Sequence, residues 1–148
     1  MTAKIFSSFI ATTPRGKGRP RIVTRKIKGV MRPIAFTPDQ TVDAESRIQT
    51  QVSGEWQRPP TESPLRVQIT VRLVKPKSKP KTKPCWPTSK PDADNYAKLV
   101  LDALNGILWR DDSQVVQLFV EKAWTTPDHP HQGYALTVHA LDQDLEVI

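Results

Sequence analysis

Apolar and polar residues alternate strictly along residues 65–74. Leu65, Val67, Ile69, Val71 and Leu73 occupy every second position, and the residues between them are Arg, Gln or Thr. A period of two places all five apolar side chains on one face of a β-strand. The pattern therefore predicts a strand with one buried face and one polar face.

Weaker alternation predicts further strands at residues 4–11, 114–124 and 134–141. In the strand at 114–124, we expect Val116, Leu118 and Val120 to share a buried face. Residues 21–36 are expected to form a hairpin that turns at Lys28-Gly29, because glycine tolerates the backbone angles of a tight turn.

Two other segments repeat apolar residues at helical spacing. The first predicted helix begins at Thr37-Pro38-Asp39 and ends before Arg58-Pro59-Pro60, where proline removes backbone donors. Its apolar stripe comprises Val42, Ile48, Val52 and Trp56. The second covers residues 93–108, which corresponds to about 24 Å of helix. Its stripe comprises Tyr96, Leu99, Val100, Ala103, Leu104 and Ile107.

The order of these elements predicts an α/β domain of the α+β kind, with a small mixed β-sheet and two helices packed on one face. A length of 148 residues fits one domain, covering residues 1–148. Residues 75–91 interrupt the pattern with six Lys and five Pro, and this spacing of proline predicts an extended loop.

The distribution of charge is more informative than the net value of +7. Residues 1–38 contain nine Lys or Arg and residues 66–91 contain eight, so 17 of the 22 basic residues lie in two stretches without any Asp or Glu. Long segments of one sign favour a polyanionic partner, and nucleic acid fits better than a membrane surface. The alternative is a pair of solvated basic loops. Within the second stretch, Trp86 is available to stack on a base.

Several chemistries are disfavoured. Cys85 is the single cysteine, which excludes an intrachain disulfide and a cysteine-based zinc site and fits a cytoplasmic setting. The spacing of His129, His131 and His139 matches no zinc-hydrolase pattern, and no nucleophile elbow supports a serine hydrolase. No apolar run is long enough for a transmembrane helix, and no signal peptide is expected.

Four carboxylates are the strongest candidates for chemistry. Asp92 and Asp94 stand where the basic loop meets the second predicted helix, and Asp111 and Asp112 follow the helix. Clustered carboxylates supply the oxygen ligands that Mg²⁺ prefers. A helix of the predicted length holds the two pairs apart, however, so spacing alone does not bring them together.

Each of these residues also has a structural alternative. Asp92 or Asp94 can cap the helix, and Asp111-Asp112 can be a polar turn. Lys98 lies one helical turn after Asp94 and one before Asp102, so it can belong to a surface ladder of ion pairs or face a phosphate. For Asp102 we favour a structural role.

The segment from Lys90 to Val116 resembles the RusA family of Holliday-junction resolvases. The shared run is D-x-D-N-x-x-K, then D-A-L, then W-x-D-D-x-Q-V, and it covers Asp92 to Val115. Residues 16–21 and 36–38 resemble the N-terminal pattern of some members. The segment between helix and turn is one residue shorter than in the family's type member, and the Lys/Pro arm is longer.

The resemblance implies a homodimeric, Mg²⁺-dependent endonuclease, often carried by prophages, that makes paired nicks in four-way DNA junctions, with Mn²⁺ able to substitute and no small-molecule cofactor. Asp92, Asp94 and Asp112 fall on the catalytic metal-binding acids, Lys98 on the catalytic lysine, and Asp111 on a neighbouring acid that we include among the metal ligands. In the family these acids lie close together, and the partner subunit of the dimer is one way in which the two acid pairs could meet.

Basic residues and one aromatic residue are expected to hold the junction arms. These are Arg15, Lys17, Arg19, Arg21, Lys75, Lys77, Lys79, Lys81, Lys83, Trp86 and Lys90. Two rival functions are a non-catalytic DNA-binding protein on the same scaffold and an RNA-binding accessory factor. Intact acids argue against the first rival, and a preference for junction DNA over structured RNA would argue against the second.

Overall fold

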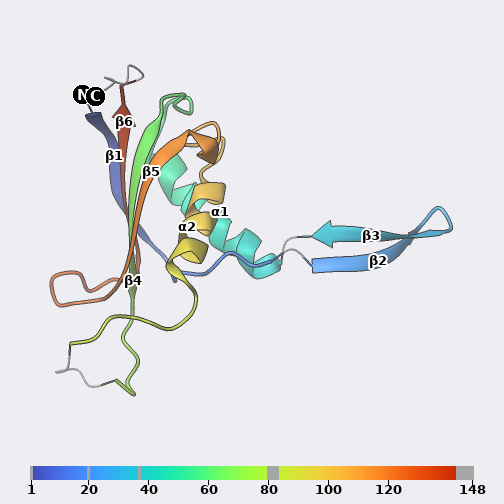
Figure 1. Ribbon diagram of the computed structural model, residues 1–148, viewed down its shortest axis with the longest axis horizontal. Coiled ribbons are helices and arrows are strands. Elements are labelled where there is room, and N and C mark those ends of the chain that lie inside the picture. The colour runs from blue at the N-terminus through green and yellow to red at the C-terminus, as the bar shows by residue number, and fades with distance from the viewer. Residues whose placement is uncertain (1, 20, 37, 80–83, 143–148) are drawn as a thin grey trace.

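A computed structural model of the chain describes residues 2–19, 21–36, 38–79 and 84–142, without the side chain of Arg21. The element order is β1 (Thr2–Ala11), β2 (Arg21–Ile27), β3 (Val30–Phe36), α1 (Asp39–Glu55), β4 (Leu65–Leu73), α2 (Ala93–Ala103), a short 3₁₀ turn (Asp112–Gln114), β5 (Val115–Trp124) and β6 (Gly133–Leu141). A sheet of four strands and the helices α1 and α2 form the body, from which the β2–β3 hairpin projects (Figure 1). The described helices include none that is long and apolar enough to cross a bilayer.

The main sheet has the strand order β1-β6-β4-β5. β6 pairs antiparallel with both β1 and β4, whereas β4 pairs parallel with β5, so the predicted mixed sheet is confirmed. The alternation along β4 is confirmed as well, since Leu65, Val67, Ile69 and Val71 are at most 2% exposed. Their side chains face the two helices, which cover one face of the sheet (Figure 1).

Helix α1 buries a slightly different stripe from the predicted one. Ile48 and Val52 are buried as expected, but Val42 is 53% exposed and the preceding Thr41 is buried instead. The hydroxyl of Thr41 accepts a hydrogen bond from the backbone N–H of Gly18. This polar contact satisfies a threonine at a position where hydrophobic spacing alone favours valine.

Helix α2 is shorter than the predicted span of 93–108 and ends at Ala103. Gly106 has a φ of +78°, and its N–H donates to the carbonyl of Trp109, which closes a turn. Leu104, Leu108 and Trp109 are nevertheless fully buried. Apolar spacing therefore identified core residues correctly but could not show where the backbone stops being helical.

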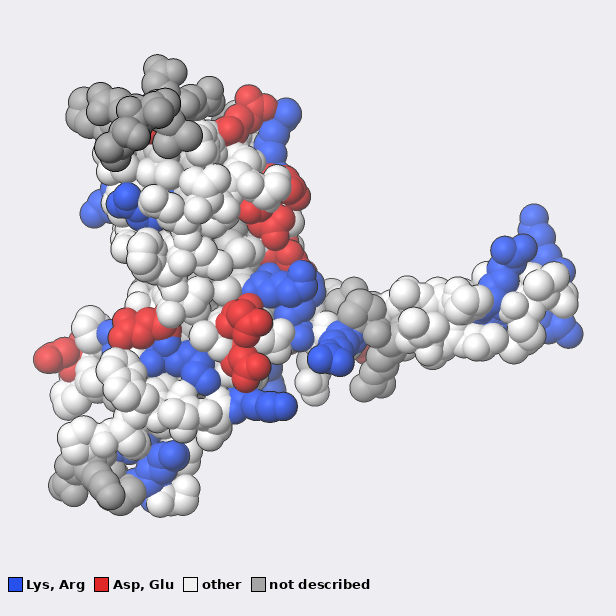
Figure 2. Space-filling view, in the orientation of Figure 1, with Lys and Arg blue, Asp and Glu red and all other residues white. Residues whose placement is uncertain are grey.

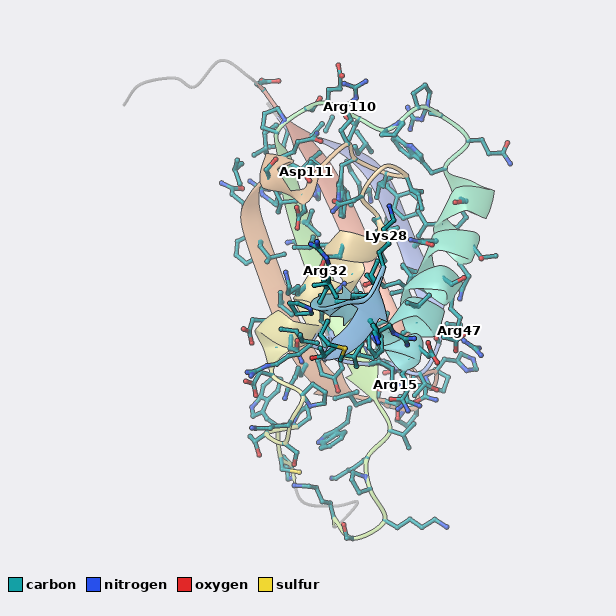
Figure 3. All side chains as sticks on the ribbon, turned by 90° about the vertical axis from the view of Figure 1, so that its right-hand side faces the viewer. Arg15, Lys28, Arg32, Arg47, Arg110 and Asp111 are labelled. Carbon is teal, nitrogen blue, oxygen red and sulfur yellow. The ribbon has the colours of Figure 1, made fainter. Side chains whose placement is uncertain are left out.

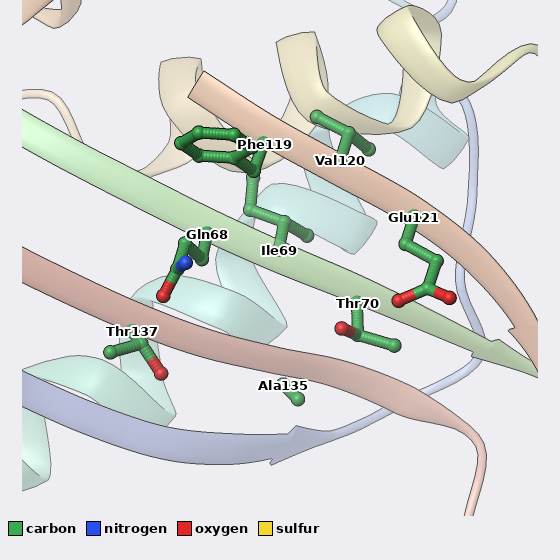
Figure 4. Close-up of a pocket in the computed structure, with 8 residues that line it drawn as sticks. All are labelled: Gln68, Ile69, Thr70, Phe119, Val120, Glu121, Ala135 and Thr137. Carbon is green, nitrogen blue, oxygen red and sulfur yellow. The ribbon is translucent and has the colours of Figure 1, made fainter. Parts of the chain in front are cut away.

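Strand β5 forms one edge of the sheet, and its apolar residues are less buried than predicted. Val120 packs against the core, but Val116 is 62% exposed and Leu118 is 43% exposed. On the sheet face away from the helices, Phe119 is 57% exposed beside Gln68 of β4, at a shallow hollow shown in Figure 4. Exposure on both sides follows from the missing neighbour strand.

The hairpin predicted at 21–36 is confirmed, with its turn at Lys28-Gly29. Both turn residues have positive φ, +50° and +80°, as in the tight turns that match the twist of an antiparallel pair. The strands pair over their full length and extend away from the sheet and helices (Figure 1).

Candidate functional site

Asp92 and Asp94 stand at the N-terminal end of α2. Asp92 occupies the capping position, but its side chain makes no capping hydrogen bond; its backbone carbonyl accepts from the N–H groups of Asn95 and Tyr96. Asp94 lies in the first turn, and both side chains are exposed. The positive end of the helix dipole favours negative charge here. Both carboxylates are therefore held in place by the helix while their oxygens stay available.

A glycine-rich segment, residues 15–19, runs against this end of α2. The N–H of Lys17 donates to the carbonyl of Asn95, and a Cβ on Gly16 would lie 2.6 Å from the Asn95 side chain. The ring of Pro91 would lie 2.9 Å from the same Cβ, so a larger residue than glycine would require a shift at this position. The backbone N–H of Arg15 also donates a hydrogen bond to the hydroxyl of Tyr134. Burial raises the pKa of this hydroxyl to about 12.

The close approach brings basic residues to the two carboxylates. A hollow at this point is lined by Lys17, Arg19, Lys90, Pro91, Asp92, Asp94 and Asn95. In the space-filling view, Lys and Arg gather beside Asp and Glu where the hairpin joins the body (Figure 2). Cations next to carboxylates in an open hollow make a surface on which a phosphate group and a metal ion can both be accommodated.

Lys17 links both helices through ion pairs. Its Nζ contacts Glu45 of α1 and lies 3.2 Å from the carboxylate of Asp102 in α2. Burial alone would lower the pKa of Lys17, but hydrogen bonds to these two carboxylates outweigh that effect and the pKa is raised. The DNA contact predicted for Lys17 would have to compete with both of these partners.

Asp112 lies beside Asp102 rather than beside Asp92 or Asp94. Desolvation raises the pKa of Asp112, and the charges of Asp102 and Asp111 and a hydrogen bond with Asp102 add to the effect. Lys98 is also drawn to this end of α2, since its Nζ lies 3.7 Å from Asp102. Asp102, for which the sequence favoured a structural role, thus contacts a predicted catalytic acid and two lysines.

Asp111 has a well-defined local task. Its side chain accepts a hydrogen bond from the N–H of Ser113, and the side chain of Gln114 accepts from the N–H of Asp111, which forms a capping box. These hydrogen bonds from Ser113 lower the pKa of Asp111. Because Oδ2 already accepts a hydrogen bond, the metal contact expected for Asp111 stays a prediction that must accommodate a capping role.

The acids therefore form two separate pairs in one copy of the chain. Eight residues of helix separate Asp94 from Asp102, or about 12 Å at the helical rise. Among the described residues, no three Asp, Glu, His or Cys side chains lie close enough together to hold a metal ion. The oxygen-only ligand set suits Mg²⁺, but a single copy does not gather it.

Of the other predicted DNA contacts, some line this hollow and others lie in the chain between β4 and α2. Lys75, Lys77 and Lys79 follow β4, and Trp86 is 66% exposed. Lys90 and Arg19 line the hollow. Lys81 and Lys83 lie outside the described residues, as does the side chain of Arg21. Seen from the hairpin side, Arg15 and Asp111 lie towards opposite ends of the body, with Lys28 and Arg32 in front (Figure 3).

Two residues of the site were not predicted from the sequence. Lys122 of β5 donates to the carbonyls of Ser89 and Pro91 and so fixes the backbone just before Asp92. Nothing in its alternating strand pattern indicates this contact. Glu45 contacts Lys17 from α1. For Asp102, its place on the helical stripe of Asp94 and Lys98 was an available signal.

Comparison with known protein families identifies the family of this chain. The profile of the family described as endodeoxyribonuclease RusA matches residues 11–129. The chain belongs to the RusA endodeoxyribonuclease family. It is also 34% identical over 126 residues to the uncharacterized protein YqaN of Bacillus subtilis strain 168, a match covering 76% of this chain and 82% of YqaN. The region matched by the family profile contains all four candidate carboxylates, Lys98 and the hairpin.

Membership of the RusA family makes the chain a nuclease that hydrolyses phosphodiester bonds in DNA. Members of the family are Holliday-junction resolving endonucleases that bind branched DNA and depend in general on a divalent metal. The sequence prediction of the family is therefore confirmed. The roles of individual residues, the metal and the assembly belong to the proposal below.

Proposed function

We propose that this chain is a Mg²⁺-dependent endonuclease that resolves four-way DNA junctions by paired symmetric nicks, in recombination and repair. The observation that carries the proposal is the hollow at the start of α2, where Asp92 and Asp94 face Arg19 and Lys90. Neither carboxylate group forms a helix-capping hydrogen bond. Oxygen ligands beside phosphate-binding cations are what a metal-assisted phosphodiesterase requires.

Each side chain has a distinct part. Asp92, Asp94 and Asp112 would hold the metal, which supplies charge stabilisation at the scissile phosphate and an activated water. Arg19 and Lys90 bind and orient the phosphate backbone. Lys98, whose side chain is 63% exposed, presents its ammonium group to the developing negative charge. Mn²⁺ is expected to substitute for Mg²⁺, because both accept oxygen ligands.

A homodimer would bring the two acid pairs together. β5 is an edge strand with exposed Leu118 and Phe119, and an uncovered apolar edge favours pairing with another strand. Asp112 precedes β5, whereas Lys122 near its other end binds the backbone next to Asp92. Antiparallel pairing of two β5 strands would set the Asp112 end of one copy against the Asp92 end of its partner. A two-fold axis also matches the two symmetric cuts.

The test is a nicking assay on a synthetic four-way junction with and without Mg²⁺. Asp94→Asn keeps the shape of the side chain but removes its charge, so we expect at least a hundredfold loss of cutting with junction binding retained. Asp43→Asn makes the same change on the exposed face of α1, where Asp43 pairs with Arg47, and should leave cutting unchanged.

Three outcomes would count against the proposal. A folded wild-type protein that binds junctions but never cuts them would favour a DNA-binding role. Equal affinity for structured RNA and junction DNA would favour an RNA-binding role. Full activity of Asp94→Asn would assign Asp94 to the helix terminus alone.

A further inference from the structure

The β2–β3 hairpin is almost entirely surrounded by solvent. Ile22 is 73% exposed, Met31 60% and Val30 53%, and the ribbon extends away from the body in Figure 1. A two-stranded ribbon without further packing is marginally stable in water. Exposed apolar side chains on such a ribbon also invite association. These residues are therefore better explained by a partner than by the hairpin's own stability.

The charges on the hairpin point in the same direction. Arg25 stands directly opposite Arg32 in the strand register, and like charges at such positions destabilise a pair of strands. Lys26 and Lys28 add two further charges, while residues 21–36 contain no Asp or Glu. No ion pair is seen for these four residues within the described part of the chain. Figure 2 shows Lys and Arg gathered at the tip.

The shape of the hairpin fits a groove of duplex DNA. Seven residues in each strand give a length of about 23 Å. The major groove of B-DNA, about 12 Å wide, admits a two-stranded ribbon. Alternation places Arg25, Arg32, Ile27 and Val30 on one face, so two guanidinium groups and two apolar side chains can reach base edges together. Arginine forks match guanine O6 and N7, and apolar groups match the thymine methyl.

The position of the hairpin also separates it from the candidate site. β2 follows the segment 15–19, which lines the hollow with Asp92 and Asp94. The tip therefore lies roughly the length of the ribbon, about 23 Å, from the segment that lines that hollow. Contacts made there can orient a junction arm without touching the acids.

We propose that the β2–β3 hairpin inserts into the major groove of a duplex arm, with its Arg25–Arg32 face towards the bases. The inference rests on the proposed DNA-cleaving function for the identity of the partner. It adds a second contact region, distinct from the hollow, through which the enzyme reads duplex geometry and guanine-containing sequence.

The test combines affinity with chemical footprinting, in EDTA so that no cutting occurs. The probes are a synthetic four-way junction and a linear duplex made of the same arm sequences. Wild-type protein should protect a run of guanine N7 atoms from dimethyl sulfate in both probes, because N7 faces the major groove. Arg25→Ser/Arg32→Ser should lose that protection and bind at least tenfold more weakly. The dependence of affinity on salt should also become weaker, because two positive charges are removed from the DNA interface.

A matched control removes two charges elsewhere. Lys4→Ser/Arg47→Ser changes exposed residues of β1 and α1 and should reduce affinity less than threefold while leaving N7 protection intact. Arg25→Ser/Arg32→Ser removes the repulsion between the two arginines, so its melting temperature should equal or exceed that of wild type. A loss of binding by this variant would therefore not result from unfolding. Arg25→Lys/Arg32→Lys keeps the charge and should recover the salt dependence but not the guanine protection.

Clear results would overturn the inference. These are unchanged N7 protection in the double-serine variant, an equal loss in the control, or an effect of the hairpin substitutions on dimerisation or phosphatidylserine vesicle binding but not on DNA. The two proposals fail separately. A protein that protects N7 through the hairpin yet never cuts retains this inference, whereas one that cuts junctions normally without Arg25 and Arg32 retains only the proposed function.

Discussion

At the scale of single residues, the carboxyl pair Asp102–Asp112 concentrates negative charge that one chain neutralises only in part. Lys17 and Lys98 both form ion pairs with Asp102, and neither forms one with Asp112. The pKa of Asp112 is raised because desolvation and the neighbouring carboxylates disfavour its ionised form. A metal ion or a second copy that neutralises the pair would therefore also stabilise the fold.

The raised pKa of Asp112 predicts the sign of a stability change. A folded-state pKa above the unfolded value means that Asp112 favours the fold below its unfolded pKa, and that this contribution is lost as pH rises through the folded pKa. Asp112→Asn should accordingly melt at a higher temperature than wild type at pH 7, and the gap should narrow towards pH 4. Thermal melts without divalent metal measure this; Asp43→Asn, on exposed helix surface, serves as the control. A lower melting temperature at pH 7 would contradict the argument.

Lys17 should matter far more for stability than Lys98, although both contact Asp102. The Lys17 side chain is 19% exposed and pairs with two partly buried carboxylates, so Lys17→Met should cost about 2 kcal/mol. Lys98 is 63% exposed, and Lys98→Met should cost no more than about 0.5 kcal/mol. Urea unfolding of both variants gives the comparison. Equal costs would show that Lys17 is not the structural link between α1 and α2.

At the scale of elements, the turn after α2 determines where Asp112 lies. Trp109 is fully buried, and its indole N–H donates to the side chain of Asn105. Thr61 fastens the same turn, because its N–H donates to the carbonyl of Leu108 and its carbonyl accepts from Arg110. The turn is thereby attached to the chain just before β4.

Removing the indole hydrogen bond should weaken this attachment. Trp109→Phe loses that bond and part of the core volume, which should cost about 1–3 kcal/mol in urea unfolding. Trp86→Phe makes the same substitution at a side chain that is 66% exposed and should cost less than about 0.5 kcal/mol. If the two variants unfold alike, the turn does not depend on Trp109.

Patterns along the chain were informative where burial on one face dictates the residues. β4 was predicted almost to the residue, because its five apolar positions all face the helices. The predicted second helix is longer than α2. Leu104 and Leu108 are buried in the turn after the helix, and their spacing is the same as that of residues on one face of a helix. Val116 and Leu118 were placed in a buried face because the pattern carries no information on which strand is at the edge.

The candidate site also combines features that the sequence predicts with features that depend on tertiary structure. Asp92, Asp94 and their basic neighbours follow from local motif and charge, whereas the contact of Asp112 with Asp102 depends on how the turn folds back. The Lys17 pairs with Glu45 and Asp102 depend on a tertiary approach that Gly16 permits. Such contacts have no signature in residue spacing.

At the scale of the whole molecule, a shared active site makes a prediction that a single-chain site does not. If Asp94 of one copy works with Asp112 of its partner, a mixed dimer of Asp94→Asn and Asp112→Asn chains contains one intact site and one doubly substituted site. Random exchange of equal amounts makes about half of all dimers mixed. Mixing the two inactive proteins should therefore restore nicking of one strand by these dimers, without paired cuts. Junctions labelled on each strand measure this. No recovery in a mixture shown to exchange subunits would place all the acids of a site in one chain.

The end of the Lys/Pro loop that leads into α2 is attached to the body by two residues of β5. The indole of Trp124 donates to the carbonyl of Cys85, and Lys122 holds Ser89 and Pro91, so the position of Asp92 is set by β5 rather than by the chain that leads up to it. These contacts keep Asp92 in position relative to β5 when the length of the loop before Cys85 changes. If the basic residues of the loop bind DNA as predicted, a change in loop length would alter how far along a DNA arm the protein makes contact, while the acids stay in place.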